Sequence, residues 1–158
     1  MNHRGLMTLI GVLALTAAAE ARSSGVEYRT SPATTSADLP FSEAVRVGNM
    51  LYLSGKIGVM PGTRNVVPGG IKAETKQVMD DMRRVLERNG SSLRHVVKCT
   101  VMLADMKEWG EMNEVYVTYF PKDRRPARSA LGVNGLALGA RVEIECIAVV
   151  SEPEPGRR

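Results

Sequence analysis

The chain has 158 residues, of which 44% are hydrophobic and 24% charged, proportions typical of one soluble globular domain. Apolar residues are spread along the sequence, which excludes a disordered chain, a collagen-like repeat and a multipass membrane protein. Lys and Arg number 21 against 17 Asp and Glu, and aromatic residues make up 4%. This mild basic excess suits an anionic small substrate. A dedicated nucleic-acid binder would carry a concentrated basic face and more rings, so we expect no nucleic-acid partner.

Residues 1–21 have the pattern of a secretory signal peptide. An uncharged run, residues 6–19, follows a basic start, and Ala19-Glu20-Ala21 fits an A-x-A cleavage site. The run is too short to span a bilayer securely, so we expect no stable membrane span. The interpretation predicts a periplasmic or secreted protein.

The two cysteines, Cys99 and Cys146, both lie in alternating apolar segments. The chain is long enough to bury a sufficient core without a disulfide. The favoured prediction is therefore two separate buried thiols, with one disulfide as the alternative. The sequence has no CxxC pair, and its histidines are His3 and His95, so the spacing predicts no zinc site.

In chain order, the first segment after the leader is an arm, residues 22–39, which is rich in Ser, Thr, Ala and Pro. It contains one candidate strand at 26–29. Two alternating apolar runs, 44–48 and 50–55, nearly abut and predict a β-hairpin. A loop rich in glycine and proline follows at 58–70.

Two helices are predicted in the centre of the chain. Residues 71–88 place apolar side chains at helical spacing and end at Asn89-Gly90. A strand at 96–103 follows, and Asp105 with Glu108 then forms a capping-box pattern for the second helix. Its predicted apolar stripe is Met106, Trp109, Met112, Tyr116 and Tyr119 or Phe120.

Two further strands, 127–133 and 141–150, precede a tail at 151–158 that we expect to be disordered. The order predicts an α+β fold in which a mixed sheet of five to six strands carries both helices on one face. The other sheet face would then be uncovered, with Val45, Leu53 and Ile147 among its candidates. Such a face predicts a homo-oligomer.

Charged residues in the last strands are the candidates for chemistry. Glu143 and Glu145 lie two residues apart and so share one face of a strand. They are either solvated or include a general base held in a cleft. Arg128, between Ala127 and Ser129, is the available cation and suits bidentate binding of a carboxylate. Asn113 lies on the apolar edge of the second helix, where its amide needs partners.

An ordered set of segments over residues 40–150 resembles the RidA/YjgF family of enamine/imine deaminases. No single segment is decisive, whereas their order is specific. The matching segments are Pro40-Phe41-Ser42-Glu43-Ala44-Val45, Gly48-Asn49, Ser54-Gly55-Lys56-Ile57, Val67-Pro68-Gly69-Gly70-Ile71, Val97-Lys98-Cys99-Thr100, Asn113-Glu114-Val115-Tyr116, Pro126-Ala127-Arg128-Ser129 and Val142-Glu143-Ile144-Glu145-Cys146-Ile147-Ala148.

The resemblance implies a chorismate-mutase-like fold and a homotrimer whose sheets face inward, with active sites in clefts between subunits. The implied reaction is hydrolysis of reactive 2-imino acids to 2-oxo acids and ammonia, without a metal or organic cofactor. Arg128 matches the arginine that holds the substrate carboxylate, and Glu143 matches the acidic residue that orients water. Ser54 and Asn113 match further pocket positions.

The chain departs from the family pattern at two pocket positions. Phe41 stands where the family often has Tyr, and Ala130 stands where it often has Cys. These departures favour a different imine preference or, as an alternative, a non-catalytic ligand-binding or chaperone-like trimer. A ribonuclease is a further alternative, supported by the basic cluster Lys122, Arg124, Arg125 and Arg128. The leader also departs from a family that is mostly cytosolic.

Overall fold

The structure is a computed structural model that describes residues 25–31 and 38–150. The predicted signal peptide, part of the arm and the tail fall on residues 1–24, 32–37 and 151–158, which lie outside the described residues.

The described residues form seven strands and two α-helices. A 3₁₀ turn at Met106–Glu108 leads into the second helix. In chain order the elements are β1 (Val26–Arg29), β2 (Ala44–Val47), β3 (Met50–Leu53), β4 (Lys56–Ile57), α2 (Gly70–Arg88), β5 (Val96–Leu103), α3 (Trp109–Tyr116), β6 (Ala127–Gly132) and β7 (Val142–Val149).

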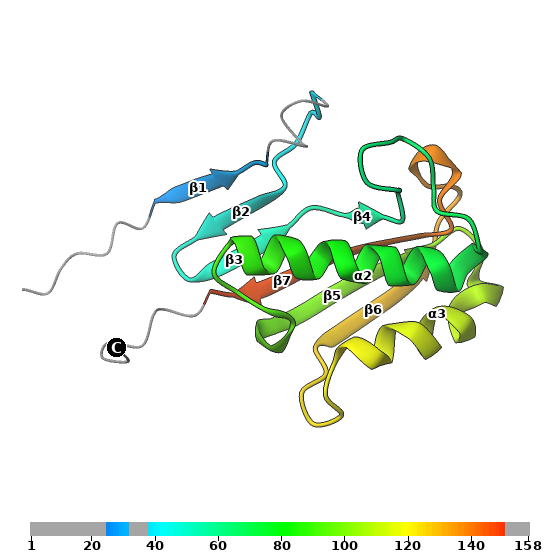
Figure 1. Cartoon of the computed structure of the whole chain (residues 1–158). Coiled ribbons are helices and arrows are strands. Elements are labelled where there is room, and N and C mark those ends of the chain that lie inside the picture. The colour runs from blue at the N-terminus through cyan, green and yellow to red at the C-terminus, as the bar shows by residue number, and fades with distance from the viewer. Residues whose placement is uncertain (1–24, 32–37, 151–158) are drawn as a thin grey trace, which may run out of the picture.

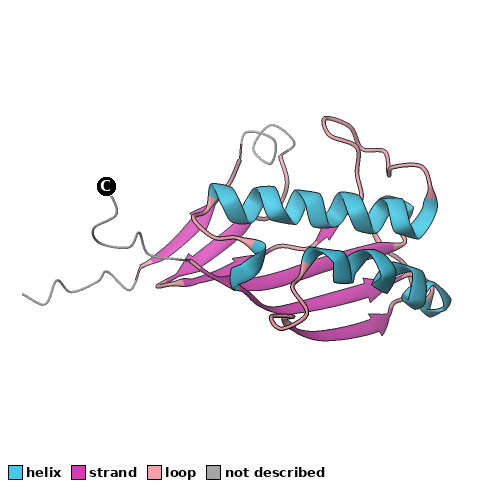
Figure 2. Cartoon of the chain, turned by 60° about the horizontal axis from the view of Figure 1, so that its bottom comes forward, coloured by secondary structure: helices cyan, strands magenta, loops and turns pink. Residues whose placement is uncertain are grey.

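The strands build one mixed sheet in the order β1-β2-β3-β7-β5-β6, and the short β4 also pairs with β7. β5 and β6 are parallel, and α3 lies in the crossover that a parallel pair requires. The other pairs are antiparallel. Both helices lie side by side on one face of the sheet (Figures 1 and 2). The predicted α+β arrangement is confirmed. The two-residue strand β4 was not predicted.

The hydrophobic core lies between the helices and the sheet. The apolar face of α2 packs there as its spacing predicts, and the helix begins one residue earlier, at Gly70. The core face of the sheet includes Leu51 and Leu53 of β3. Leu53 is therefore wrong as a candidate for the uncovered face, since its side chain lies under the helices. Val45 and Ile147 are in the same row of residues as Tyr52, on the opposite face.

A disulfide joins Cys99 and Cys146, so the prediction of separate thiols is wrong. The two residues are direct partners in the antiparallel β5–β7 pair, with Cα atoms 4.1 Å apart. Both side chains face the core, and the cysteines are 0% and 2% exposed. The alternation of each segment places its cysteine inward, whereas the register that brings the two together is set by the whole sheet.

The start of α3 differs from the predicted capping box. Asp105 caps as expected and accepts a hydrogen bond from the Lys107 N–H at 2.9 Å. The carboxylate of Glu108 instead accepts from Nη1 of Arg141 at 2.5 Å. The first turn is a 3₁₀ turn with three residues per turn, so the predicted apolar stripe shifts there. Met106 and Trp109 are 45% and 43% exposed, while the rest of the stripe, at Met112, Tyr116 and Phe120, is buried.

Candidate active site

Arg128 lies on the edge strand β6 and is held by side chains of α3. Its Nη1 donates to Oδ1 of Asn113 at 2.5 Å, and its guanidinium carbon lies 4.8 Å from the ring centre of Tyr116 and 6.0 Å from that of Trp109. Spacings of three and four residues put these three side chains on one side of α3. Arg128 forms no salt bridge with any described residue. It is thus a fixed, half-buried cation with hydrogen-bond donors to spare.

Tyr116 is buried beside this cation and carries an unpaired hydroxyl. Within residues 25–31 and 38–150, its hydroxyl is the only fully buried side-chain polar atom that lacks a hydrogen-bond partner. Burial raises the pKa of Tyr116 to about 12, and the charge of Arg128 opposes that rise. The phenol is therefore neutral near pH 7, and its ring rather than its charge stabilises the guanidinium.

Glu143 lies on β7 opposite Ile57 of β4 and Met102 of β5. Its carboxylate rests against Gly55, where any β-carbon would collide with it. Burial, and secondly the charge of Glu145, raise the pKa of Glu143. A partly desolvated carboxylate with a raised pKa is suited to accept a proton from water.

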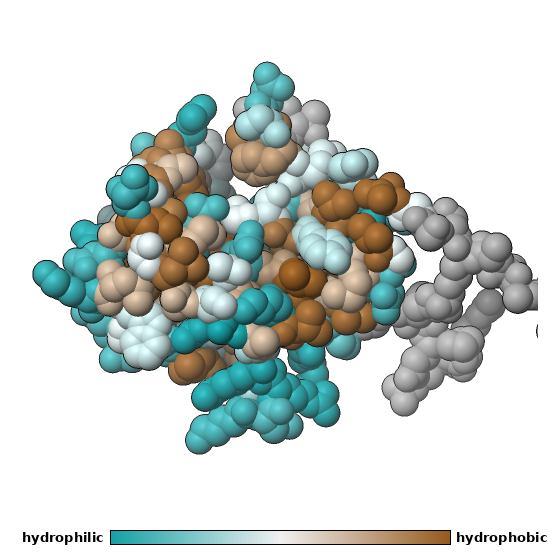
Figure 3. All heavy atoms as spheres, turned by 180° about the vertical axis from the view of Figure 1, so that it is seen from behind, coloured by the Kyte–Doolittle hydropathy of each residue, from teal (hydrophilic) through white to brown (hydrophobic). Residues whose placement is uncertain are grey.

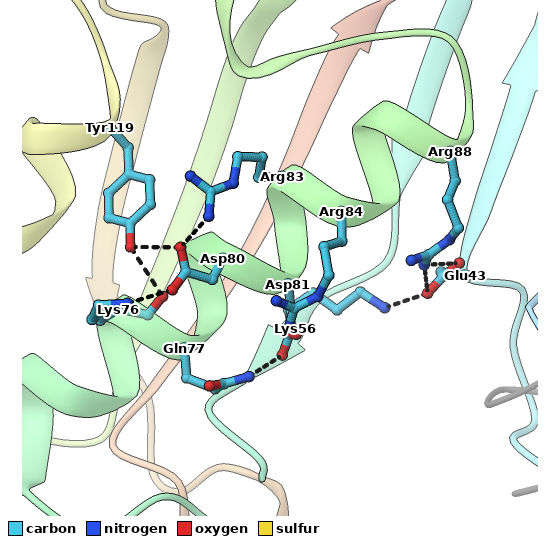
Figure 4. A network of polar contacts seen from close by, with 10 residues as sticks. All are labelled: Glu43, Lys56, Lys76, Gln77, Asp80, Asp81, Arg83, Arg84, Arg88 and Tyr119. Atoms are coloured by element: carbon cyan, nitrogen blue, oxygen red, sulfur yellow. Dashed lines mark hydrogen bonds and ion pairs between the residues drawn. The ribbon is translucent and has the colours of Figure 1, made fainter. Parts of the chain in front are cut away.

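Ser54 follows β3 and is fixed by the backbone before β2. Its hydroxyl donates to the carbonyl of Ser42 at 2.7 Å, and its N–H donates to the carbonyl of Glu43 at 3.1 Å. Nη2 of Arg88 donates to both carboxylate oxygens of Glu43 at 2.8 Å, and Nζ of Lys56 lies 3.4 Å from one of them (Figure 4). This cluster ties the end of α2 to the segment that positions Ser54.

The two remaining predicted pocket residues differ in their surroundings. Phe41 precedes β2 and is 48% exposed. Ala130 is partly buried and packs against the hydrophobic core. It lies two residues after Arg128 on the same face of β6.

Within one chain, Arg128 and Glu143 lie on opposite faces of the sheet. Arg128 is in register with Cys99, whose side chain is in the core beneath the helices. Glu143 lies between the core residues Val142 and Ile144, so it faces the other way. The interpretation of Arg128 as the cation beside the carboxylates of β7 is therefore wrong for a single chain. Asn113 and Ala130 lie near Arg128, whereas Gly55 lies against Glu143.

The sheet face opposite the helices carries patches of hydrophobic side chains interrupted by polar ones (Figure 3). A hollow of about 140 Å³ on it is lined by the outward-facing Tyr52, Lys98, Thr100, Glu145 and Ile147. Leu53 and Cys146, whose side chains face the core, lie at its floor. In the part of the chain that the structure describes, no three potential metal ligands cluster together. No helix there is long and apolar enough to cross a membrane.

Sequence reasoning missed three contributors to the site. The sequence pattern places Tyr116 and Trp109 in the apolar stripe of α3, and their spacing from Asn113 also puts them on its side of the helix. Gly55 belongs to the segment Ser54-Gly55-Lys56-Ile57 that resembles the family. Its contact with Glu143 depends on the pairing of β4 with β7, which is distant in sequence.

Comparisons with known proteins identify the family of this chain. A family model described as Endoribonuclease L-PSP matches residues 31–150. The 2-iminobutanoate/2-iminopropanoate deaminase of Mus musculus is 46% identical over 110 residues, which cover 70% of this chain and 81% of the mouse protein. The crystal structure of yeast Mmf1 matches with a TM-score of 0.68 at 35% identity and covers 78% of this chain and 93% of Mmf1.

The structure of RidA from an Antarctic Psychrobacter bacterium matches with a TM-score of 0.67 at 38% identity, over 71% of this chain and 89% of that protein. These likenesses confirm the predicted fold. The chain belongs to the endoribonuclease L-PSP family, which is the RidA/YjgF family that its motifs resemble.

Proposed function

We propose that this protein is an enzyme that hydrolyses reactive 2-imino acids to 2-oxo acids and ammonia. The observation that carries the proposal is the state of Arg128. An amide and two aromatic rings hold its guanidinium, and no described carboxylate pairs with it. Such a cation is prepared for a carboxylate from outside the chain. The mouse relative bears the name of a deaminase of two small 2-imino acids, which supports this substrate class.

The proposed reaction needs only that the protein holds the substrate in place and supplies one base for the attacking water. Arg128 binds the carboxylate of the substrate, and the protonated imine carbon beside it is already electrophilic. Glu143 accepts a proton as water adds its oxygen to that carbon. Glu143 returns this proton to the nitrogen of the resulting carbinolamine. As the carbon–nitrogen bond breaks and ammonia leaves, the hydroxyl proton passes to Glu143, and the carbonyl of the 2-oxo acid forms. The raised pKa of Glu143 makes its ionised form a stronger base than an exposed carboxylate.

We propose that a homotrimer completes each site between neighbouring chains. The opposite orientations of Arg128 and Glu143 favour this assembly, because one chain cannot direct both at one substrate. One subunit would supply Arg128, Asn113 and Ala130. The next would supply Glu143, with Gly55 against its carboxylate, together with Ser54 and Phe41, which match pocket positions of the family. Phe41 lacks the hydroxyl of the usual Tyr, so water is held by fewer polar groups there.

The protein is also proposed to act outside the cytoplasm. The uncharged run before Ala19-Glu20-Ala21 suits export. The Cys99–Cys146 disulfide supports the same conclusion, because disulfides persist in oxidising compartments.

The test is an assay in which an amino-acid oxidase supplies the imino acid and the release of 2-oxo acid is measured above the spontaneous rate. Arg128→Ala should lower kcat/KM by about 10- to 100-fold, since hydrogen bonds to a charged group contribute roughly 1.5–3 kcal/mol. Arg124→Ala is the matched control, because Arg124 is exposed and pairs with its neighbour Asp123. Equal rates for wild type and Arg128→Ala would overturn the proposal.

Two other results would support the alternative functions. A rise in the melting temperature with 2-oxo acids that Arg128→Ala abolishes, without turnover, would indicate a non-catalytic binding protein. Cleavage of RNA, with binding that weakens steeply as salt increases, would indicate a ribonuclease.

A further inference from the structure

The surface next to Arg128 is apolar and exposed. Arg128, Ala130 and Gly132 follow one another on the helix-side face of β6. Trp109 lies beside the guanidinium of Arg128, and Met106 packs directly over Gly132, where a β-carbon would come within 2.9 Å of its Cγ. We call these five residues the β6 strip. It joins one cation to two small residues and two exposed apolar side chains.

Trp109 and Met106 are exposed, in contrast to the rest of the predicted apolar stripe of α3. Both belong to the predicted apolar stripe, yet 43% and 45% of their surfaces are exposed. Beside an anion-binding residue, these apolar side chains are placed to contact the apolar part of a ligand whose carboxylate Arg128 binds. Ala130 and Gly132 have little or no side chain above the strand. Trp109 and Met106 therefore form the apolar boundary of the β6 strip.

We propose that the β6 strip selects 2-imino acids with large apolar or aromatic side chains, such as those from phenylalanine, leucine or methionine. The inference rests on the proposed function. A carboxylate bound at Arg128 leaves the α-carbon of the substrate one bond further out. Its side chain can then reach the indole, whose centre lies 6.0 Å from the guanidinium carbon. An aromatic side chain stacks on that indole, whereas the methyl group of an alanine-derived imine is too short to cover it.

The experiment compares kcat/KM for the phenylalanine-derived and the alanine-derived imino acids, each supplied by an amino-acid oxidase. Wild type should favour the larger substrate by about tenfold or more, the discrimination that an apolar pocket contact commonly gives. Trp109→Ala should remove most of this preference, and Trp109→Phe should restore it. Leu138→Ala is the matched control, because Leu138 is equally exposed, at 48%, but lies outside the β6 strip.

The outcomes separate this inference from the proposed function. If wild type turned over both imino acids with similar kcat/KM, only the role of the β6 strip would be overturned. The same would follow if Trp109→Ala left the ratio of the two kcat/KM values unchanged. Absence of all turnover would overturn the proposed function. In that case, the binding of 2-oxo acids tests the role of the β6 strip. The role of the β6 strip is supported if 3-phenyl-2-oxopropanoate raises the melting temperature more than 2-oxopropanoate does and Trp109→Ala abolishes this difference. Equal rises with the two ligands would overturn it.

Discussion

At the scale of single residues, Tyr116 carries a hydroxyl that costs stability. Its oxygen is fully buried and has no hydrogen-bond partner among residues 25–31 and 38–150. Its ring packs at a tilt against Phe120, with centres 5.0 Å apart, and against the guanidinium of Arg128. Tyr116→Phe keeps both ring contacts and removes an unsatisfied polar atom. We therefore expect the free energy of unfolding to rise by about 1 kcal/mol, measured by urea denaturation.

Tyr119 provides the matched control. Burial likewise raises its pKa to about 12, but its hydroxyl donates to Oδ1 of Asp80, 3.1 Å away (Figure 4). Tyr119→Phe should lower the free energy of unfolding by about 0.5–1.5 kcal/mol, the net contribution of one hydrogen bond. If Tyr116→Phe destabilised the protein as much as Tyr119→Phe, the hydroxyl of Tyr116 would have an unrecognised partner.

At the scale of secondary-structure elements, the disulfide ties the two longest strands together. Cys99 of β5 and Cys146 of β7 are 47 residues apart in sequence, so the link closes a long loop in the unfolded chain. On the loop-entropy model, this contributes roughly 2–4 kcal/mol to stability. Wild type under a phosphine reductant should unfold at a correspondingly lower urea concentration than under oxidising conditions.

The control for this experiment is the double replacement Cys99→Ala with Cys146→Ala. Alanine avoids the unpaired buried hydroxyl that serine would introduce. The double variant should match reduced wild type and should not respond to reductant. A wild-type unfolding midpoint that stays constant after verified reduction of the disulfide would contradict a stabilising role.

Elements with a long, regular apolar pattern could be predicted from sequence, and irregular ones could not. The spacing of α2 and the alternation of β5 both correspond to burial on one face, so their bounds are nearly those observed. β4 is two residues long and has no period to detect. The start of α3 is shifted by a 3₁₀ turn and by the contact of Glu108 with Arg141, which is distant in sequence.

At the scale of the whole molecule, the candidate site shows where sequence reasoning stops. Local periodicity predicts that Asn113 lies on the apolar edge of its helix and that Glu143 lies on one face of its strand. The pairing of Arg128 with Asn113, and the separation of Arg128 from Glu143 across the sheet, depend on strand order and register. Long-range pairing of this kind is not encoded in any short segment.

The proposed assembly makes a prediction that only an oligomer can satisfy. Arg128→Ala and Glu143→Gln should each retain about a tenth of wild-type activity or less when alone, because every site lacks one group. If neighbouring chains share each site, random mixing of the two variants places an intact Arg128 beside an intact Glu143 in about a quarter of the sites of a cyclic trimer. Refolding an equimolar mixture should therefore restore about a quarter of wild-type kcat, with trimers verified by light scattering.

The control mixes Arg128→Ala with a chain that carries both substitutions, so that no site contains an arginine at position 128. That mixture should stay inactive. If each site lay within one chain, neither mixture could regain activity, because every chain would still carry its own substitution in its own site. Mixed trimers without restored activity would therefore refute the shared site. Because Arg128 and Glu143 face opposite sides of each sheet, restored activity would show that the neighbouring chain supplies the missing group.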